Sequence, residues 1–249
     1  MKPFNMSQIT TLTFFKYKGL KSKIWAFGMM QYAHKYLGAC PGLQFYKLMG
    51  SGRGLGFNPF PDFSVYCLLQ VWDSSEKADD FFDSNPLMQQ YEANTEEHWT
   101  LFLKVLSSKG EWSKQNPFEV SNDIDPDKSE IAVITRATIK WHQLIKFWSY
   151  VPTSEGNISQ LKGLKYTKGI GEVPLIQMAT FSLWKDKKAL QEFAYQSKGH
   201  QGAIQRTRKH DWYSEELFAR FQVFKQRGSW EAAKGANHSA YSKNSFSPT

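Results

Sequence analysis

The feature that most limits how this chain can fold is an internal repeat. The alternating run ITTLTFFKY at residues 9–17 returns as IAVITRATIK, which starts at residue 131 (131 minus 9, or 122 residues later). The run VYCLLQVWDSSEKADDFF returns as LIQMATFSLWKDKKALQEF, with its tryptophan moved from Trp72 to Trp184 (184 minus 72, or 112). Each half then closes on a strand-like run and a tryptophan, Trp112 and Trp230 (230 minus 112, or 118). Successive features with similar offsets predict two copies of one structural unit.

Each unit reads strand, helix, strand, strand, helix, strand, with period-two alternation in the strands and aromatic-rich helices from Ile24 and from Trp141. This order is the split βαβ pattern of a ferredoxin-like module. A four-stranded sheet with both helices on one face leaves its other face apolar and in need of a cover. The predicted fold class is therefore α+β, with tandem ferredoxin-like repeats that stack their sheets into a dimeric-α+β-barrel-like fold around an apolar cavity.

The repeat also divides the chain into regions. We place the first ferredoxin-like repeat at residues 8–113, a linker at 114–129 and the second repeat at 130–231. The remaining residues, 232–249, read EAAKGANHSAYSKNSFSPT from Glu231 onward and are poor in large apolar side chains. Such a composition predicts a disordered tail.

Charge and composition exclude several classes of protein. The chain carries 31 Lys and Arg against 23 Asp and Glu, a net charge of +8, but its basic residues are scattered and no nucleic-acid motif occurs, so we expect no nucleic-acid partner. No run approaches the roughly 18 apolar residues of a spanning helix, and the N-terminus lacks the pattern of a secretory signal, so we expect a cytoplasmic protein. The two cysteines, Cys40 and Cys67, are isolated and encode no disulfide framework or cysteine zinc site.

The glycine-rich segment GSGRGLG at residues 50–56 does not have the form of a phosphate loop, because the prolines of the following FNPFPDF leave no room for a helix. Two interpretations remain. The segment is a flexible connection between strands, or its glycines let the backbone approach a bulky ligand, with Arg53 available for an anionic group.

Six histidines occur, and none shows the close spacing of a zinc site. A single histidine can still hold haem iron, because the porphyrin supplies four of the ligands. His200 is the first candidate, since it opens a predicted helical region of the second repeat; the alternative is a helix cap or a surface residue. His210 is the second candidate, although its charged neighbours favour a solvent-facing position. In the strand LFARF that follows, alternation directs Arg220 to the face opposite Phe221.

Three segments carry a resemblance to a known family: residues 45–72, 98–118 and 199–221. They are similar to the spheroidene monooxygenases of bacterial carotenoid synthesis, most specifically in the Gly-Ser-Gly segment with its following Phe and Pro, and in WYSEELFARF. The resemblance covers nearly the whole chain apart from the first residues and the tail. It also extends, distantly, to the haem proteins with a dimeric α+β barrel.

The resemblance implies a haem-dependent monooxygenase that hydroxylates and then ketolates an acyclic, spheroidene-like carotenoid, using O2 and reducing equivalents from a donor such as ferredoxin. It implies that His200 binds the iron, that Arg220 is a catalytic polar group, and that Arg53 and Arg220 bind the haem propionates. A membrane-dissolved substrate also implies peripheral contact with the inner membrane. Two alternatives stay open: a non-enzymatic haem carrier or sensor on the same barrel, and a basic, aromatic protein that binds a ligand or membrane without metal.

Overall fold

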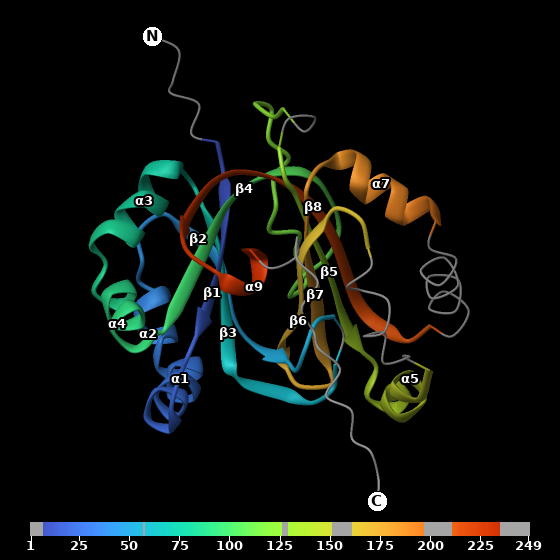
Figure 1. Ribbon diagram of the computed structural model, residues 1–249, viewed down its shortest axis with the longest axis horizontal. Helices are drawn as coiled ribbons and strands as arrows, with labels where there is room; N and C mark the ends of the chain where they lie inside the picture. Colours follow the sequence, from blue (N-terminus) through green and yellow to red (C-terminus); the bar gives the residue numbers. More distant parts are fainter. Residues whose placement is uncertain (1–6, 57, 126–128, 151–160, 197–210, 235–249) are drawn as a thin grey trace, which may run out of the picture.

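The computed structural model describes residues 7–56, 58–125, 129–150, 161–196 and 211–234 (Figure 1). The first half contains β1 (Ile9–Lys16), α1 (Leu20–Tyr32), α2 (His34–Leu37), β2 (Leu43–Gly52), β3 (Pro61–Trp72), α3 (Ser75–Ser84), α4 (Pro86–Asn94) and β4 (Glu97–Gly110). The second half contains β5 (Ile131–Ile139), η1 (Trp141–Gln143), α5 (Leu144–Tyr150), β6 (Leu164–Val173), β7 (Gln177–Trp184), α7 (Lys187–Gln196), β8 (Tyr213–Gly228) and α9 (Glu231–Lys234).

The eight strands form one closed antiparallel barrel in the order β1-β3-β2-β6-β7-β5-β8-β4. Within each half the four strands are arranged alike, as β4-β1-β3-β2 and as β8-β5-β7-β6, which is the ferredoxin-like order. The two sheets join along two seams. The β4–β8 seam is long, from Trp99 opposite Gly228 to Gly110 opposite Leu217, whereas β2 and β6 pair only at Gly50–Gly171 and Ser51–Ile170. The predicted fold class is confirmed.

The helices of the first half have local sequence signals at their starts. Ser74 caps α3 by accepting a hydrogen bond from the backbone N–H of Lys77, and Asn85 caps α4 by accepting one from Leu87. Pro86 occupies the first turn of α4, where its missing N–H costs nothing. Within the described ranges, no helix is long and apolar enough to cross a membrane.

The inside of the barrel is filled by side chains, which corrects the expectation of an apolar cavity there. Strands β1 and β7 lie on opposite walls, yet the rings of Phe14 and Phe181 have centroids 5.3 Å apart. Tyr166, Trp99 and Trp230 complete the same cluster around Phe14, at centroid distances of 5.4 to 6.0 Å. The two repeats therefore close over a packed aromatic core.

The packed interior also contains a group of paired charges. Arg136 of β5 is buried, donates to Glu215 and lies 3.4 Å from Glu172 of β6. Glu172 is also 2.5 Å from the ammonium of Lys47 and accepts a hydrogen bond of 2.6 Å from the indole of Trp112. Because each charge faces a partner, the group is compatible with burial.

The segment between the repeats packs against the barrel. Phe118 is buried and meets the ring of Phe221 edge-on at 5.1 Å, and the N–H of Ser121 donates to the carbonyl of Val105. The expected tail begins as the end of α9, at residues 232–234, and residues 235–249 lie outside the described residues.

Candidate ligand site on the outer face of the second sheet

The outer faces of the two sheets can be compared position by position, because the strand registers of the two repeats match. In the first sheet, Thr13 lies between Leu68 and Thr100; in the second, Thr135 lies between Thr180 and Phe218. The neighbouring row gives Thr11 with Phe102 in the first sheet and Val133 with Arg220 in the second. Each of these outward-facing residues in the first repeat therefore has an equivalent residue in the second repeat.

The outer face of the first sheet is closed by large side chains beneath its helices. Phe15, Leu68 and Phe102 are at most 1% exposed. Phe15 stacks on Tyr91 of α4 with centroids 4.5 Å apart, and Phe102 meets Phe82 of α3 at 5.4 Å. No room is left between this sheet and its helices at these positions.

The second sheet has smaller or polar residues at the same three positions: Ala137 for Phe15, Thr180 for Leu68 and Arg220 for Phe102. Thr135 beside them is exposed, and Ala137 and Thr180 are partly exposed. We call the outward residues Thr135, Ala137, Thr180, Ser182, Phe218 and Arg220 the second-sheet face. Loss of side-chain volume over three neighbouring strands leaves this face open where its counterpart is filled.

Apolar clusters border the second-sheet face on two sides. Towards α5, one cluster consists of Ile139, Phe147, Met178 and Trp212, with Leu144, Trp148 and Tyr213 packed on it. Towards α7, the other consists of Ile131, Val133 and Trp184, with partners that include Leu190 and Phe193. Figure 1 shows α5 and α7 at opposite ends of this half with the sheet between them. A flat apolar molecule on this face would contact aromatic groups on both sides.

The second-sheet face also presents exposed positive charge. The guanidinium carbon of Arg220 lies 5.1 Å from the centroid of the Phe218 ring, and its side chain is exposed. Among the described residues, no ion pair of Arg220 is found. Lys109, exposed on β4, lies directly across from Phe218. These cations could bind carboxylates carried by a ligand.

The structure does not bring the two predicted arginines together. Arg53 is exposed in the turn after β2, where its Nε donates to the carbonyl of Pro61 at 3.3 Å. Strands β2 and β8 are four strands apart in either direction around the barrel. Residues 50–52 form the end of β2, and residues 53–56 begin the connection to β3. His200 and His210 lie outside the described residues, in the segment 197–210 that joins α7 to β8.

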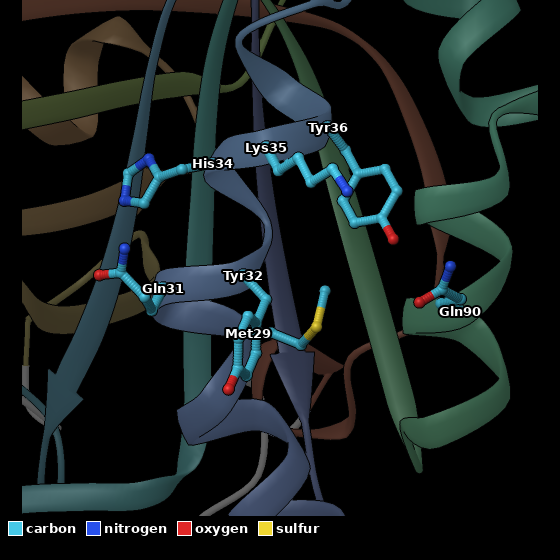
Figure 2. Close-up of a pocket in the computed structure, with 7 residues that line it drawn as sticks. All are labelled: Met29, Gln31, Tyr32, His34, Lys35, Tyr36 and Gln90. Atoms are coloured by element: carbon cyan, nitrogen blue, oxygen red, sulfur yellow. The ribbon is translucent and has the colours of Figure 1, made fainter.

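A separate hollow among the described residues lies beside α1, α2 and α4. It has a volume of about 540 Å³ and is lined by Met29, Gln31, Tyr32, His34, Lys35, Tyr36 and Gln90. Figure 2 shows that His34 and Gln31 extend to one side of the helices, whereas Tyr36 and Lys35 extend to the other, towards Gln90. The Nδ1 atom of His34 forms a hydrogen bond of 3.0 Å with the hydroxyl of Tyr46. Because these side chains do not converge, the hollow lacks the arrangement of a binding site.

Metal ligation by clustered side chains finds no support in the part of the chain that the structure describes, where no three His, Cys, Asp or Glu side chains are grouped. Strand alternation predicts the face of β8 on which Arg220 lies, but it does not predict the small side chains around it. A signal was present, because aligning the two repeats residue by residue sets Ala137 against Phe15 and Thr180 against Leu68.

No known protein-family model matches the chain. The chain is 35% identical over 228 residues to spheroidene monooxygenase of Cereibacter sphaeroides, covering 90% of this chain and 69% of that protein. It is 34% identical over 223 residues to spheroidene monooxygenase of Rhodobacter capsulatus, covering 89% and 92%. Among solved structures, aldoxime dehydratase in complex with butyraldoxime has a TM-score of 0.58 at 9% identity, covering 89% of this chain and 80% of that one, a likeness of fold alone. With two such relatives matched over most of its length, the chain belongs to the spheroidene monooxygenase family.

Proposed function

We propose that the protein is a haem-dependent monooxygenase that hydroxylates and ketolates an acyclic carotenoid, with the haem bound on the second-sheet face. The observation that carries the proposal is the exchange of three buried large residues of the first sheet for Ala137, Thr180 and Arg220 in the second. Membership of the spheroidene monooxygenase family supports the proposed oxygenation of a carotenoid. The small side chains of the second-sheet face support the proposed position of the haem.

The residues of this face suit a porphyrin. Thr135, Ala137 and Thr180 give a floor of low side chains, and the clusters next to α5 and α7 give apolar contacts for the ring. Arg220 and Lys109 would hold the propionates by charge-assisted hydrogen bonds. We assign this role to Arg220 and not to Arg53, because Arg53 is on the opposite side of the barrel. We propose His200, from the adjoining segment, as the iron ligand.

When bound, haem would supply binding and activation of O2. The role of this chain's own residues is to orient the cofactor and to exclude water around it, which limits the loss of activated oxygen. We further propose that Arg220 acts as the catalytic polar group at the edge of the site. Insertion of one oxygen atom, with the other leaving as water, consumes two electrons and two protons. We propose that a separate donor such as ferredoxin supplies the electrons, since the net charge of +8 favours an acidic partner.

The first test is the absorption spectrum of protein produced with a haem precursor. We expect a Soret band that is lost in His200→Ala and retained in Arg220→Gln, with haem affinity in Arg220→Gln about 10- to 100-fold weaker, as for the loss of a charged hydrogen bond. Arg53→Gln provides the comparison between the two arginines. An equal loss of affinity in Arg53→Gln would contradict the assignment of the site.

The second test separates an enzyme from a carrier. Coexpression with enzymes that make an acyclic carotenoid should yield oxygenated pigment with the wild type and not with His200→Ala. Full haem loading with unchanged carotenoids would support the haem carrier or sensor instead. Absence of any haem binding would support the metal-free alternative.

A further inference from the structure

One end of the molecule gathers exposed apolar side chains that nothing in the described structure covers. Helix α1 is apolar on two sides: Ala26 and Met29 are buried against the sheet, while Leu20, Ile24 and Phe27 on the outer side are 62% to 75% exposed. These three residues are spaced by four and three positions and so form one stripe along the helix. A surface helix ordinarily has a polar outer side, so this stripe indicates a partner.

The second repeat has a matching feature. The residues after β5 correspond to those after β1, and there Trp141 and Ile145 are 81% and 89% exposed. Figure 1 shows α1 and α5 at the same edge of the molecule, one on each side of the connection from β2 to β3. Two helices with exposed apolar side chains therefore lie along one edge of the molecule.

The strand connections between these helices are also apolar and exposed. Leu55, Phe60 and Phe63 lie in or next to the β2–β3 connection, and Val173 and Leu175 lie at the β6–β7 connection. The indole of Trp148 on α5 donates to the carbonyl of Leu175 at 3.1 Å, which joins the second helix to the β6–β7 connection. We call the stripe on α1, the exposed residues Trp141 and Ile145, and these two connections the lower face.

The lower face is strongly basic. The segments 18–37, 53–63, 140–149 and 173–176 contain Lys18, Lys21, Lys23, Lys35, Arg53, Lys140 and Lys146. Their single carboxylate is Asp62, which pairs with Lys168 at 2.9 Å. Lys18 and Lys140 have ion pairs with Glu96 and Asp211 beyond these segments, whereas the other five cations have none within the described residues. Acidic residues gather instead on α3, at the opposite edge in Figure 1.

We propose that the lower face docks the protein on the surface of an anionic lipid bilayer, with the side chains of α1 and α5 inserted among the lipids. Apolar and aromatic side chains surrounded by lysines are the composition of interfacial membrane-binding elements. A second copy of the chain is a poor occupant, because two such faces would bring like charges together. Docking on a bilayer would give a membrane-dissolved carotenoid a route to the enzyme. This link to the carotenoid rests on the proposed function, whereas the docking itself does not.

The test is sedimentation of the full-length protein with vesicles, which requires neither haem nor turnover and so can fail independently of the proposed function. We expect binding to vesicles of phosphatidylglycerol and phosphatidylcholine, weaker binding to phosphatidylcholine alone, and loss of binding as salt rises. Lys21→Gln with Lys23→Gln should weaken binding by roughly fivefold per charge. The matched control is Lys185→Gln, just before α7, with Lys188→Gln on α7, which should bind like the wild type.

The apolar contribution is tested by Phe27→Ser with Ile145→Ser, for which we expect at least tenfold weaker binding. Val120→Ser, which also removes an exposed apolar side chain, is its control. Circular dichroism confirms that each variant is folded; because the substituted side chains are exposed, we expect them to leave the fold intact. The proposal is wrong if the wild-type protein does not bind anionic vesicles, or if the variants bind as tightly as their controls. It is also wrong if the wild-type protein without vesicles is a dimer that Phe27→Ser with Ile145→Ser dissociates.

Discussion

Exchanging equivalent residues between the two sheets gives the sharpest test of the second-sheet face. Phe15 and Ala137 occupy the same position in the two repeats, on the outer side of β1 and β5. If the first position is structural and the second makes room for a ligand, Phe15→Ala and Ala137→Phe should have opposite consequences. The first variant should lose stability, and the second should lose ligand binding.

The magnitudes follow from the surroundings of each residue. Phe15 is 1% exposed and stacks on Tyr91, so its truncation should cost about 3–5 kcal/mol. For a chain of this size, roughly 2–4 °C per kcal/mol then gives a melting temperature lower by about 6–20 °C. Ala137 is partly exposed, so Ala137→Phe should change stability by about 0.5 kcal/mol or less. Its ring would occupy the ligand's space, and an overpacking penalty of about 1–3 kcal/mol corresponds to roughly 5- to 150-fold weaker binding.

The assays are thermal unfolding of both variants without ligand and titration of both with haem, followed by absorbance. Ala137→Ser is the control for the second variant, because it changes the residue without filling the face. Wild-type haem affinity in a folded Ala137→Phe protein would refute the assignment of the site. A stability loss in Ala137→Phe as large as that in Phe15→Ala would show that the two faces are packed alike.

Three further predictions concern the interior. Arg136→Ala should destabilise the protein by about 3–5 kcal/mol in urea titrations, because Glu215 and Glu172 lose the guanidinium that faces them, whereas Lys188→Ala should cost about 0.5 kcal/mol or less. Burial opposes ionisation of Glu215, but the N–H groups of Lys114 and Ser113 and the charge of Arg136 outweigh it and lower its pKa below the usual 4.5. The stability advantage of the wild type over Glu215→Gln should therefore be constant at neutral pH and shrink as pH falls below about 4.5; an advantage that grows in acid would contradict this. Burial raises the pKa of the Cys67 thiol, so Cys67 should react with a thiol reagent only after unfolding, and rapid labelling of the native protein at Cys67 would show the core to be open.

Much of the fold could be predicted because its signals are local and are repeated. The alternation in ITTLTFFKY and IAVITRATIK predicts two equivalent strands, and these are observed as β1 and β5. The same two-fold pattern predicts that one sheet covers the other. The interior was predicted less well, since Phe14 and Phe181 are distant in sequence and alternation alone does not show that their rings meet.

The candidate site was predicted in part. Alternation placed Arg220 on the strand face opposite Phe221, which is where the structure has it. The sequence could not show whether Arg220 and Arg53 lie close enough to bind the same ligand, because closure of the barrel decides which strands are neighbours. The role of His200 stays a prediction.

The sequence by itself determined that this protein has two copies of one α+β unit, because periodicity, caps and turns act over a few neighbouring residues. The tertiary structure decided what each face of the sheets became. It filled the barrel with aromatic rings, brought Arg136 to Glu172 and Glu215, and left Thr135 exposed and Ala137 partly exposed. These outcomes depend on side-chain volumes and charges contributed by strands far apart in the chain, which become neighbours only when the barrel closes.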